Sequence, residues 1–409
     1  MFAPPLHTTL RVPTTAISTQ KYLLSENWTK HSQTPDLFYK KGTINPNLTP
    51  DPELFNTCVD EICASSVLRG ANVFANGVLA APRYIMKEDK LNLYGVVGGK
   101  KPLRGWCDWD QVLETADLVF LGICVAEQDR SDIFNRLDGA KPSGVALRLL
   151  ERRFDVPDYK CLEEVKFESC DLEFSPQNLP SILASRMLEI DGSEDHILDM
   201  CAAPGGKTQH LADIIRETSS QNKPILHAFE KSSQRTTNLK TKLSKKYPEI
   251  KIKKQDSCKT GSEYDSFFDK ILLDAPCSAS GGRPQLVQKT RPDSQLSNVV
   301  IQRSLMIRAS EMVKVGGVLL YSTCSVNAEE NTDNVKWFLE KLSGKYEKLE
   351  ERIFDPWLAC GVDRFGNLLN SEVEEKINSE SGIVCMHKIE NSVDEDTIGF
   401  YICKFKRLI

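Results

Sequence analysis

The most constraining feature of the chain is a turn of small residues between a short apolar segment and an amphipathic one. The apolar segment is HILDM at 196–200, the turn contains Gly205 and Gly206, and KTQHLADIIRET at 207–218 has the pattern of a helix. Glycine lets the backbone approach a ligand closely, and a helix N-terminus attracts negative groups. This unit is typical of the first βα turn of a doubly wound sheet, where nucleotides bind.

Strand and helix patterns alternate through the rest of the chain. Segments of helical length and pattern, such as 292–314 and 328–345, separate short apolar runs. This alternation predicts an α/β fold with a mostly parallel, doubly wound sheet and helices on both faces. The further strands are predicted at 224–230, 251–256, 267–276, 316–325 and 397–406.

The segment at 69–150 has a different pattern, with short apolar runs broken by Gly and Pro. It predicts a small β-rich module ahead of the α/β domain. We therefore expect three parts. Residues 1–68 form an extension packed on the catalytic domain, 69–150 the β-rich module, and 160–409 the α/β domain.

The composition indicates the cellular compartment and argues against a metal site. Hydrophobic residues make up 40% and charged residues 27% of the 409 residues, a normal balance for a globular protein. With no apolar run long enough for a membrane helix and no secretory pattern, we expect a cytoplasmic or nuclear monomer. None of the thirteen cysteines has C-x-x-C spacing, so we expect reduced thiols and no metal site.

The formal net charge of −5 conceals a basic segment at 231–259, which holds ten Lys or Arg and two acids. Such a stripe can bind phosphates, or it can be the solvated face of a helix. The sequence leaves both interpretations open.

Acidic residues end four successive predicted strands: Asp199, Glu230, Asp256 and Asp274. Glu230 follows Gly206 by 24 residues, a separation that suits contact with the ribose hydroxyls of a nucleoside cofactor. Asp256 is placed to face an adenine and Asp274 the reacting end. The pattern fits adenosine-containing cofactors in general and does not select S-adenosylmethionine over a dinucleotide.

Two strand ends carry cysteines, Cys277 in DAPCS and Cys324 in STCS. In a parallel sheet both would lie over one crevice. Methylation at carbon 5 of cytosine needs a thiolate that adds to carbon 6 and a base that later removes the carbon 5 proton. A free thiol has a pKa of about 8.5, so the site must favour its ionisation. The alternative is that both cysteines are buried packing residues.

These residues closely resemble the Nop/Sun family of RNA cytosine-5 methyltransferases. The similarity covers about 160–409 and includes FSPQNLPS at 174–181 and DTIGFYICKF at 396–405. Its central motifs are CAAPGGKT at 201–208, LLDAPCSASGGRP at 272–284 and YSTCSVNAEENTDNV at 321–335.

The resemblance implies S-adenosylmethionine as cofactor, Cys324 as nucleophile and Cys277 as the residue that aids product release. Asp274 and Lys207 would also lie near the target base. An Asp is more usual in the family at the position of Glu230. The implied cofactor contacts are Cys201, Ala202, Ala203, Pro204, Gly205, Gly206, Lys207, Glu230, Asp256 and Asp274.

Upstream, VLRGANVFANGVLAA at 67–81 and DLVFLGICVAE at 117–127 look like a PUA domain, although Asn76 stands where a Pro is expected. With TTLRV at 8–12, the layout resembles the sixth Sun-domain paralogue type, which methylates the acceptor end of tRNA. The resemblance therefore implies tRNA as partner. Within this module the loop GGKKPLRG offers Lys100, Lys101 and Arg104 as RNA phosphate contacts, or as an ordinary solvated loop.

Two other functions remain open on the sequence alone. A catalytically silent RNA-binding protein could retain the methyltransferase fold, although the presence of Cys277, Cys324, Lys207 and Asp274 argues against it. A small-molecule methyltransferase would have no evident use for the PUA-like module.

Overall fold

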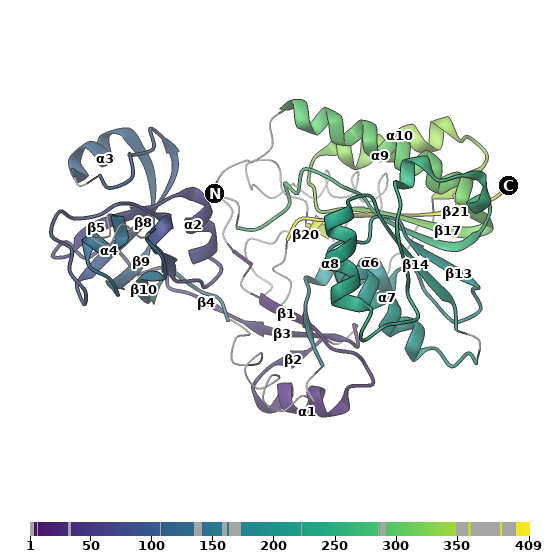
Figure 1. Cartoon of the computed structure of the whole chain (residues 1–409), viewed down its shortest axis with the longest axis horizontal. Coiled ribbons are helices and arrows are strands. Elements are labelled where there is room, and N and C mark those ends of the chain that lie inside the picture. The colour runs from purple at the N-terminus through teal and green to yellow at the C-terminus, as the bar shows by residue number, and fades with distance from the viewer. Residues whose placement is uncertain are drawn as a thin grey trace. The chain divides into compact units, whose positions relative to one another are not determined.

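The computed structural model divides into two compact units, each described here by itself (Figure 1). The first comprises Met1–Thr8, Lys41–Cys161 and Arg283–Lys289, and the second Thr9–Lys40, Leu162–Gly282 and Thr290–Ile409. The structure describes residues 4–5, 7–31, 34–106, 108–134, 141–157, 162, 173–221, 223–284, 286, 292–348, 359–360, 385–386 and 398–409.

A seven-stranded sheet forms the centre of the second unit, in the order β15-β14-β13-β16-β17-β21-β18. Neighbouring strands from β15 to β17 are parallel, and β21 runs antiparallel to both β17 and β18. The predicted mostly parallel sheet is confirmed. The strands are β13 (His196–Asp199), β14 (Ile225–Glu230), β15 (Lys251–Lys254), β16 (Phe268–Asp274), β17 (Val313–Thr323), β18 (Tyr346–Lys348) and β21 (Tyr401–Arg407).

Helices cover both faces of this sheet because successive strand residues point to opposite sides. Leu272 packs in one core with Leu211 and Leu239, whereas the next residue, Leu273, packs in the other with Met306. The helices are α6 (Leu179–Arg186), α7 (Gly206–Glu217), α8 (Ser233–Leu243), α9 (Pro292–Met312) and α10 (Thr332–Lys341). Short 3-10 turns are η2 (Ser257–Lys259), η3 (Ser262–Tyr264) and η4 (Ala328–Glu330).

Residues 9–40 belong to the second unit and are held by buried polar contacts to α7. Arg11, 1% exposed, pairs with Asp213 of α7. Asp36, also 1% exposed, lies 2.5 Å from Nε2 of His210 on the same helix. The segment includes α1 (Ile17–Ser25). A small sheet is formed here in the order β12 (Ser175–Pro176), β1 (His7–Arg11), β3 (Leu37–Lys41) and β2 (Thr29–Lys30), with β12 contributed by a distant part of the chain.

A six-stranded sheet in the order β6-β10-β9-β8-β5-β7 forms the first unit. Its strands are β5 (Phe55–Val59), β6 (Val73–Phe74), β7 (Val78–Ala80), β8 (Lys90–Gly99), β9 (Ala116–Ala126) and β10 (Val145–Arg152), beside a separate pair of β4 (Thr43–Ile44) and β11 (Phe154–Asp155). The helices are α2 (Glu61–Val67), α3 (Trp109–Thr115) and α4 (Arg130–Phe134), with the 3-10 turn η1 (Ala75–Gly77).

The boundaries of this unit differ from the predicted 69–150. Its longest segment is Lys41–Cys161, and β5 belongs to its sheet because β5 pairs in parallel with β8. Val59 and Val67 are buried in its core. The part of the expected N-terminal extension after residue 40 therefore belongs to the β-rich unit. Among the described residues, no helix is long and apolar enough to cross a membrane.

Candidate active site

The glycine turn after β13 combines one tightly packed glycine with one open glycine. Gly205 has a φ of +99°, which L side chains rarely adopt, and a Cβ added there would lie 2.6 Å from Cδ1 of Leu239. At Gly206, the first residue of α7, an added Cβ would meet no atom within 4 Å. The turn is thus held against α8 at Gly205 and leaves backbone accessible at Gly206.

Glu230, at the end of β14, is a buried carboxylate with a fixed orientation. Its Oε1 accepts a hydrogen bond from the backbone N of Ser232 at 2.8 Å, and its Oε2 lies 3.5 Å from Nη1 of Arg235. The Arg235 guanidinium also donates to the carbonyl of Ala203 in the glycine turn. The Arg235 side chain therefore links Glu230, at the end of β14, to the glycine turn after β13. The sequence predicts that both places contact a nucleoside cofactor.

Asp256 follows β15 and caps the turn η2, where it accepts a hydrogen bond from the backbone N of Cys258. Its Oδ2 lies 3.0 Å from Nζ of the exposed Lys231. Burial opposes ionisation, but Lys231 and the capping bond hold the pKa of Asp256 below its ordinary value. Asp256 is therefore an ionised acceptor at the same edge of the sheet.

Asp199 is buried and accepts a hydrogen bond from the Thr208 hydroxyl at 2.7 Å. Its Oδ1 has no hydrogen-bond partner, and burial raises the pKa of this carboxyl to about 6, against the effect of Thr208. An unpaired buried acceptor beside the glycine turn fits a polar ligand there. Together with the open face of Gly206, it gives the turn a surface that a polar ligand would fit.

The two candidate cysteines lie in contact, with Sγ of Cys277 3.4 Å from Sγ of Cys324. Both thiols are partly exposed. The Cys277 thiol, donating to Cys324, lowers the pKa of Cys324, and burial and Asp274 oppose this effect while Lys207 adds to it. The same contact, with burial, raises the pKa of Cys277. The pair therefore favours a Cys324 thiolate beside a Cys277 thiol.

Lys207 and Asp274 form an ion pair next to these thiols. Nζ of Lys207 is 2.7 Å from Oδ2 of Asp274, whose Oδ1 accepts from the Ser322 hydroxyl at 2.8 Å. The Lys207 ammonium also lies 5.1 Å from the ring centroid of Phe400. All the residues predicted for catalysis thus come together in the second unit.

A buried polar layer under the cysteines escaped the sequence analysis. Ser278 and Ser325, each directly after a cysteine, have hydroxyl oxygens 3.1 Å apart. Glu330 accepts hydrogen bonds from both the backbone N and the hydroxyl of Ser278. The only available signal was the run of polar residues after Cys324, which also fits an exposed helix start.

The candidate RNA contacts of the first unit have different surroundings. Lys100 is exposed, and Lys101 lies 3.3 Å from Glu61 on the surface. The Arg104 guanidinium donates instead to the backbone carbonyls of Ala75, at 3.0 Å, and Ile133. Arg104 therefore fastens its loop, whereas Lys100 and Lys101 are exposed residues.

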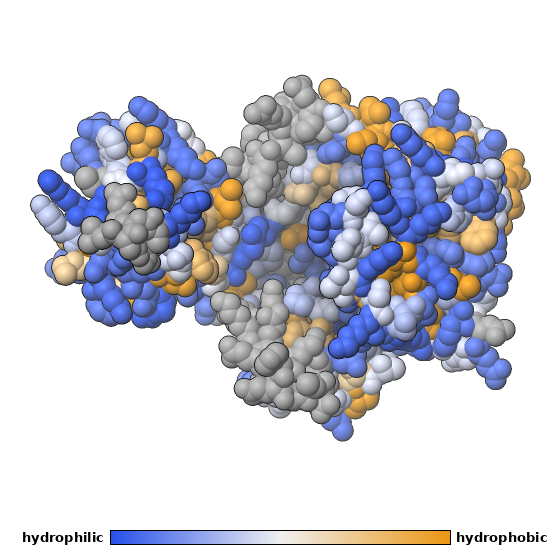
Figure 2. Space-filling model, viewed as in Figure 1, coloured by the Kyte–Doolittle hydropathy of each residue, from blue (hydrophilic) through white to orange (hydrophobic). Residues whose placement is uncertain are grey.

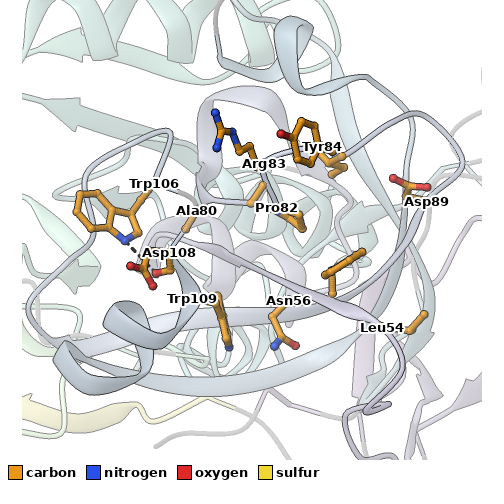
Figure 3. Close-up of a pocket in the computed structure, with 13 residues that line it drawn as sticks. Leu54, Asn56, Ala80, Pro82, Arg83, Tyr84, Asp89, Trp106, Asp108 and Trp109 are labelled. Carbon is orange, nitrogen blue, oxygen red and sulfur yellow. Dashed lines mark hydrogen bonds between the residues drawn. The ribbon is translucent and has the colours of Figure 1, made fainter.

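The first unit also contains a pocket of about 390 Å³ with aromatic walls (Figure 3). Nε1 of Trp106 donates to the carbonyl of Asp108. The ring of Trp109 packs on the ring of Tyr94, with 5.3 Å between the ring centroids. Tyr84 is 79% exposed. The pocket is lined by Leu54, Phe55, Asn56, Ala80, Ala81, Pro82, Arg83, Tyr84, Ile85, Asp89, Trp106, Asp108 and Trp109. It gives the unit a preformed surface for a flat apolar group.

The basic segment at 231–259 includes α8, whose leucines Leu239 and Leu243 face the core. Its lysines are exposed, and the area of α8 in Figure 2 is white and blue, the colours of intermediate and of hydrophilic residues. Lys231 and Arg235 face the acids of the candidate cofactor site. The rest of the segment is the polar face of an amphipathic helix, which is compatible with either interpretation.

Comparison with known proteins gives consistent matches. Residues 187–363 match the family model of the 16S rRNA methyltransferase RsmB/F. The mouse tRNA (cytosine(72)-C(5))-methyltransferase NSUN6 is 31% identical, over 98% of this chain and 87% of its own length. The tRNA (cytosine(72)-C(5))-methyltransferase of Pyrococcus horikoshii is also 31% identical, over 83% of this chain and 79% of its own length.

A solved structure extends this similarity to the whole fold. The crystal structure of NSun6 from Pyrococcus horikoshii with SFG, an S-adenosylmethionine analogue, superposes with a TM-score of 0.72 at 26% identity. The match covers 99% of this chain and 92% of that one. With the glycine turn and the thiol pair in place, these similarities show that the chain belongs to the Nop/Sun family of RNA cytosine-5 methyltransferases.

Proposed function

We propose that this protein transfers a methyl group from S-adenosylmethionine to carbon 5 of a cytosine near the acceptor end of tRNA. The observation that carries the proposal is the contact between Cys277 and Cys324 beside the glycine turn. The relatives named for cytosine 72 of tRNA match 83% or more of this chain, which supports the acceptor end as the target region.

The residues around the turn fit the cofactor. Glu230 offers a buried carboxylate to the ribose hydroxyls, Asp256 an acceptor toward the adenine, and residues 201–207 a backbone surface. S-adenosylmethionine, when bound, supplies an electrophilic methyl group. What the protein must add is activation of the cytosine, because carbon 5 is a weak nucleophile.

Cys324 is the nucleophile in this proposal. Its thiolate forms a bond to carbon 6 of the base, and the ring electrons shift to carbon 5, which becomes nucleophilic. The hydrogen bond from Cys277 and the charge of Lys207 both favour the thiolate. Asp274 and Lys207 lie close enough to this thiol to contact the polar edge of the base and to orient its ring.

Cys277 acts after methylation. The proton on carbon 5 must leave so that the carbon 5–carbon 6 double bond can re-form and the bond to the Cys324 sulfur can break. The contact with Cys324 is the largest cause of the raised pKa of Cys277. Once Cys324 is an uncharged thioether, that cause disappears, and Cys277 ionises more readily at the stage when a base is needed.

The first unit, in this proposal, is a PUA-like module that grips the tRNA. Lys100 and Lys101 are the phosphate contacts, and the aromatic pocket offers ring faces to an unpaired base. The Lys100→Ala/Lys101→Ala variant should lose tRNA affinity and show a shallower salt dependence. Arg104 is left intact because it fastens its loop. Equal binding by the variant and the wild type across a salt series would refute this assignment.

The decisive experiment is bisulfite sequencing of tRNA incubated with the protein and cofactor. We propose that the enzyme acts as a monomer in the cytoplasm or the nucleus, so the incubation uses the pH of these compartments. Cys324→Ala should abolish methylation and form no covalent complex. Cys277→Ala should accumulate a protein–RNA complex that resists denaturation, because elimination stalls. If neither variant traps RNA and both methylate, the cysteines are packing residues. Binding of tRNA without methylation by the wild type would favour the catalytically silent alternative.

A further inference from the structure

Two consecutive residues, Glu330 and Asn331, hold the loops that carry the two cysteines. Glu330 ends η4 and is fully buried, and Asn331 is 4% exposed. Oε1 of Glu330 accepts from the backbone N of Ser278 at 2.9 Å, and its Oε2 accepts from the Ser278 hydroxyl at 2.5 Å. The residue directly after Cys277 is therefore fixed at two atoms.

Asn331 does the same for the other cysteine, on both of its sides. Its Oδ1 accepts from the hydroxyl of Thr323 at 2.6 Å, and its Nδ2 donates to the carbonyl of Ser325 at 2.9 Å. Thr323 and Ser325 flank Cys324 and are fully buried. The residue on each side of Cys324 is thus tied to one amide side chain, Thr323 through its hydroxyl and Ser325 through its backbone carbonyl.

The position before Cys277 is held from α9. Nε2 of Gln302 donates to the carbonyl of Pro276 at 2.9 Å and lies 3.3 Å from Oε1 of Glu330. The groups that donate to Glu330 here are a backbone amide, a hydroxyl and side-chain amides, all of them neutral. A buried carboxylate held by such neutral donors depends on their geometry, since they stabilise it only when well aligned.

We propose that Glu330 and Asn331 are positioning residues that set the spacing of the two thiols, Glu330 for the release step and Asn331 for the attack step. Neither side chain need touch the substrate. This inference rests on the proposed function for the identity of the two steps. The spacing itself is a property of the protein and can be measured without methyl transfer.

The roles predict opposite effects on the covalent intermediate. Glu330→Ala frees Ser278 and displaces Cys277, so turnover should fall at least tenfold while the covalent protein–RNA complex accumulates. Asn331→Ala displaces Cys324, so turnover should fall without a complex. Glu330→Gln keeps an acceptor for the Ser278 backbone and should recover turnover to within about threefold of wild type. Glu329→Ala and Asp333→Ala, at exposed neighbouring positions, are the matched controls.

A second measurement reads the thiol spacing in the full-length protein without RNA. Phenylarsine oxide joins two adjacent thiols, forming two As–S bonds and releasing water. Peptide mass spectrometry should show the arsenic bridge between Cys277 and Cys324 in wild type, Glu329→Ala and Glu330→Gln. It should show at least tenfold slower bridging in Glu330→Ala and in Asn331→Ala, and none in Cys277→Ala. Thermal melting of each variant identifies any loss of fold.

The outcomes separate this inference from the proposed function. If Glu330→Ala formed the arsenic bridge and turned over substrate as fast as the wild type, the inference would be wrong. It would also be wrong if Glu330→Ala and Asn331→Ala gave the same ratio of covalent complex to methylated product. If Glu330→Ala does not fold, Glu330→Gln provides the test. A Glu330→Gln variant as inactive as Cys277→Ala would overturn the inference, because a residue that only positions the Cys277 loop should be replaceable by glutamine. A wild-type protein that bridges arsenic but does not methylate tRNA would refute the proposed function alone.

Discussion

Nζ of Lys207 lies 2.7 Å from Oδ2 of Asp274, so one ion pair joins the helix that follows the glycine turn to the strand end before Cys277. Because Lys207 also lowers the pKa of Cys324, a residue beside the glycine turn acts on the proposed nucleophile. Loss of the Lys207 charge should therefore have a measurable effect on the thiol.

Lys207→Met should raise the pKa of Cys324 and shift its alkylation to higher pH. The reason is that the ammonium stabilises the thiolate, while burial and Asp274 oppose it. The rate of iodoacetamide labelling of the Cys324 peptide, followed by mass spectrometry across a pH series, measures this shift. Lys240→Met, on the exposed face of α8, is the control. An unchanged profile in Lys207→Met would mean that this ammonium does not act on the thiol.

Cys277→Ala should move the same alkylation profile further to higher pH. The hydrogen bond from Cys277 is the largest cause of the lowered pKa of Cys324, and alanine removes the donor. The variant still contains Lys207, so the shift isolates the thiol–thiol contact. If Cys324 instead becomes more reactive at low pH, the assignment of donor and acceptor is reversed.

Gly205 and Gly206 should respond differently to alanine. Gly205→Ala places a side chain at a φ of +99° and should lower the free energy of unfolding by about 1–2 kcal/mol. Gly206→Ala meets no protein atom within 4 Å and should leave that free energy nearly unchanged. It should instead weaken cofactor binding by about 1–3 kcal/mol, as expected for a methyl group that crowds a bound ligand. Thermal melting and calorimetry measure the two effects, and equal cofactor affinity in Gly206→Ala would place the ligand elsewhere.

Glu230→Ala should weaken S-adenosylmethionine binding by about 1–3 kcal/mol, because the ribose hydroxyls lose a buried acceptor. Glu230→Asp should bind within a few-fold of wild type, since an acid of either length can accept from a ribose. Glu249→Ala removes an exposed carboxylate and serves as the charge control. Titration calorimetry that finds the same affinity in all three variants would remove Glu230 from the cofactor site.

His210 should make stability depend on pH. Burial lowers the pKa of His210 from 6.5 to about 4, although Asp36 opposes the shift. Since the unfolded chain binds the proton first, stability is complete above pH 6.5 and decreases by up to about 3 kcal/mol as the pH falls to 4. His227 titrates in the same window, so the comparison must be between wild type and His210→Gln. Denaturant unfolding at several pH values should show a weaker pH dependence in the variant.

The sequence predicted six of the seven strands of the central sheet, most of them as apolar runs between polar segments, and missed β18. The same alternation placed Cys277 and Cys324 at neighbouring strand ends, and their 3.4 Å contact agrees with that placement. The direction of β21 was not predicted, because an apolar run does not reveal which way a strand enters the sheet.

Contacts between distant residues set the limit of prediction. Arg11 pairs with Asp213, 202 positions away, and no local pattern marks such a partner. Arg104 resembles an RNA contact in sequence, yet its partners are the backbone carbonyls of Ala75 and Ile133. Glu330 looks like an acid in the first turn of an exposed helix, and only the tertiary fold places it under Cys277.

The position of β21 has a consequence for the order in which the chain is assembled during synthesis. This strand, Tyr401–Arg407, lies between β17 and β18, although both of those precede it in the chain. Until it has left the ribosome, β17 has an unpaired edge on that side, and an unpaired apolar edge invites wrong pairing. The strand that ends next to the proposed nucleophile is therefore completed by a segment that is translated after β18, so this side of the sheet is finished only after both neighbours of β21 have been made.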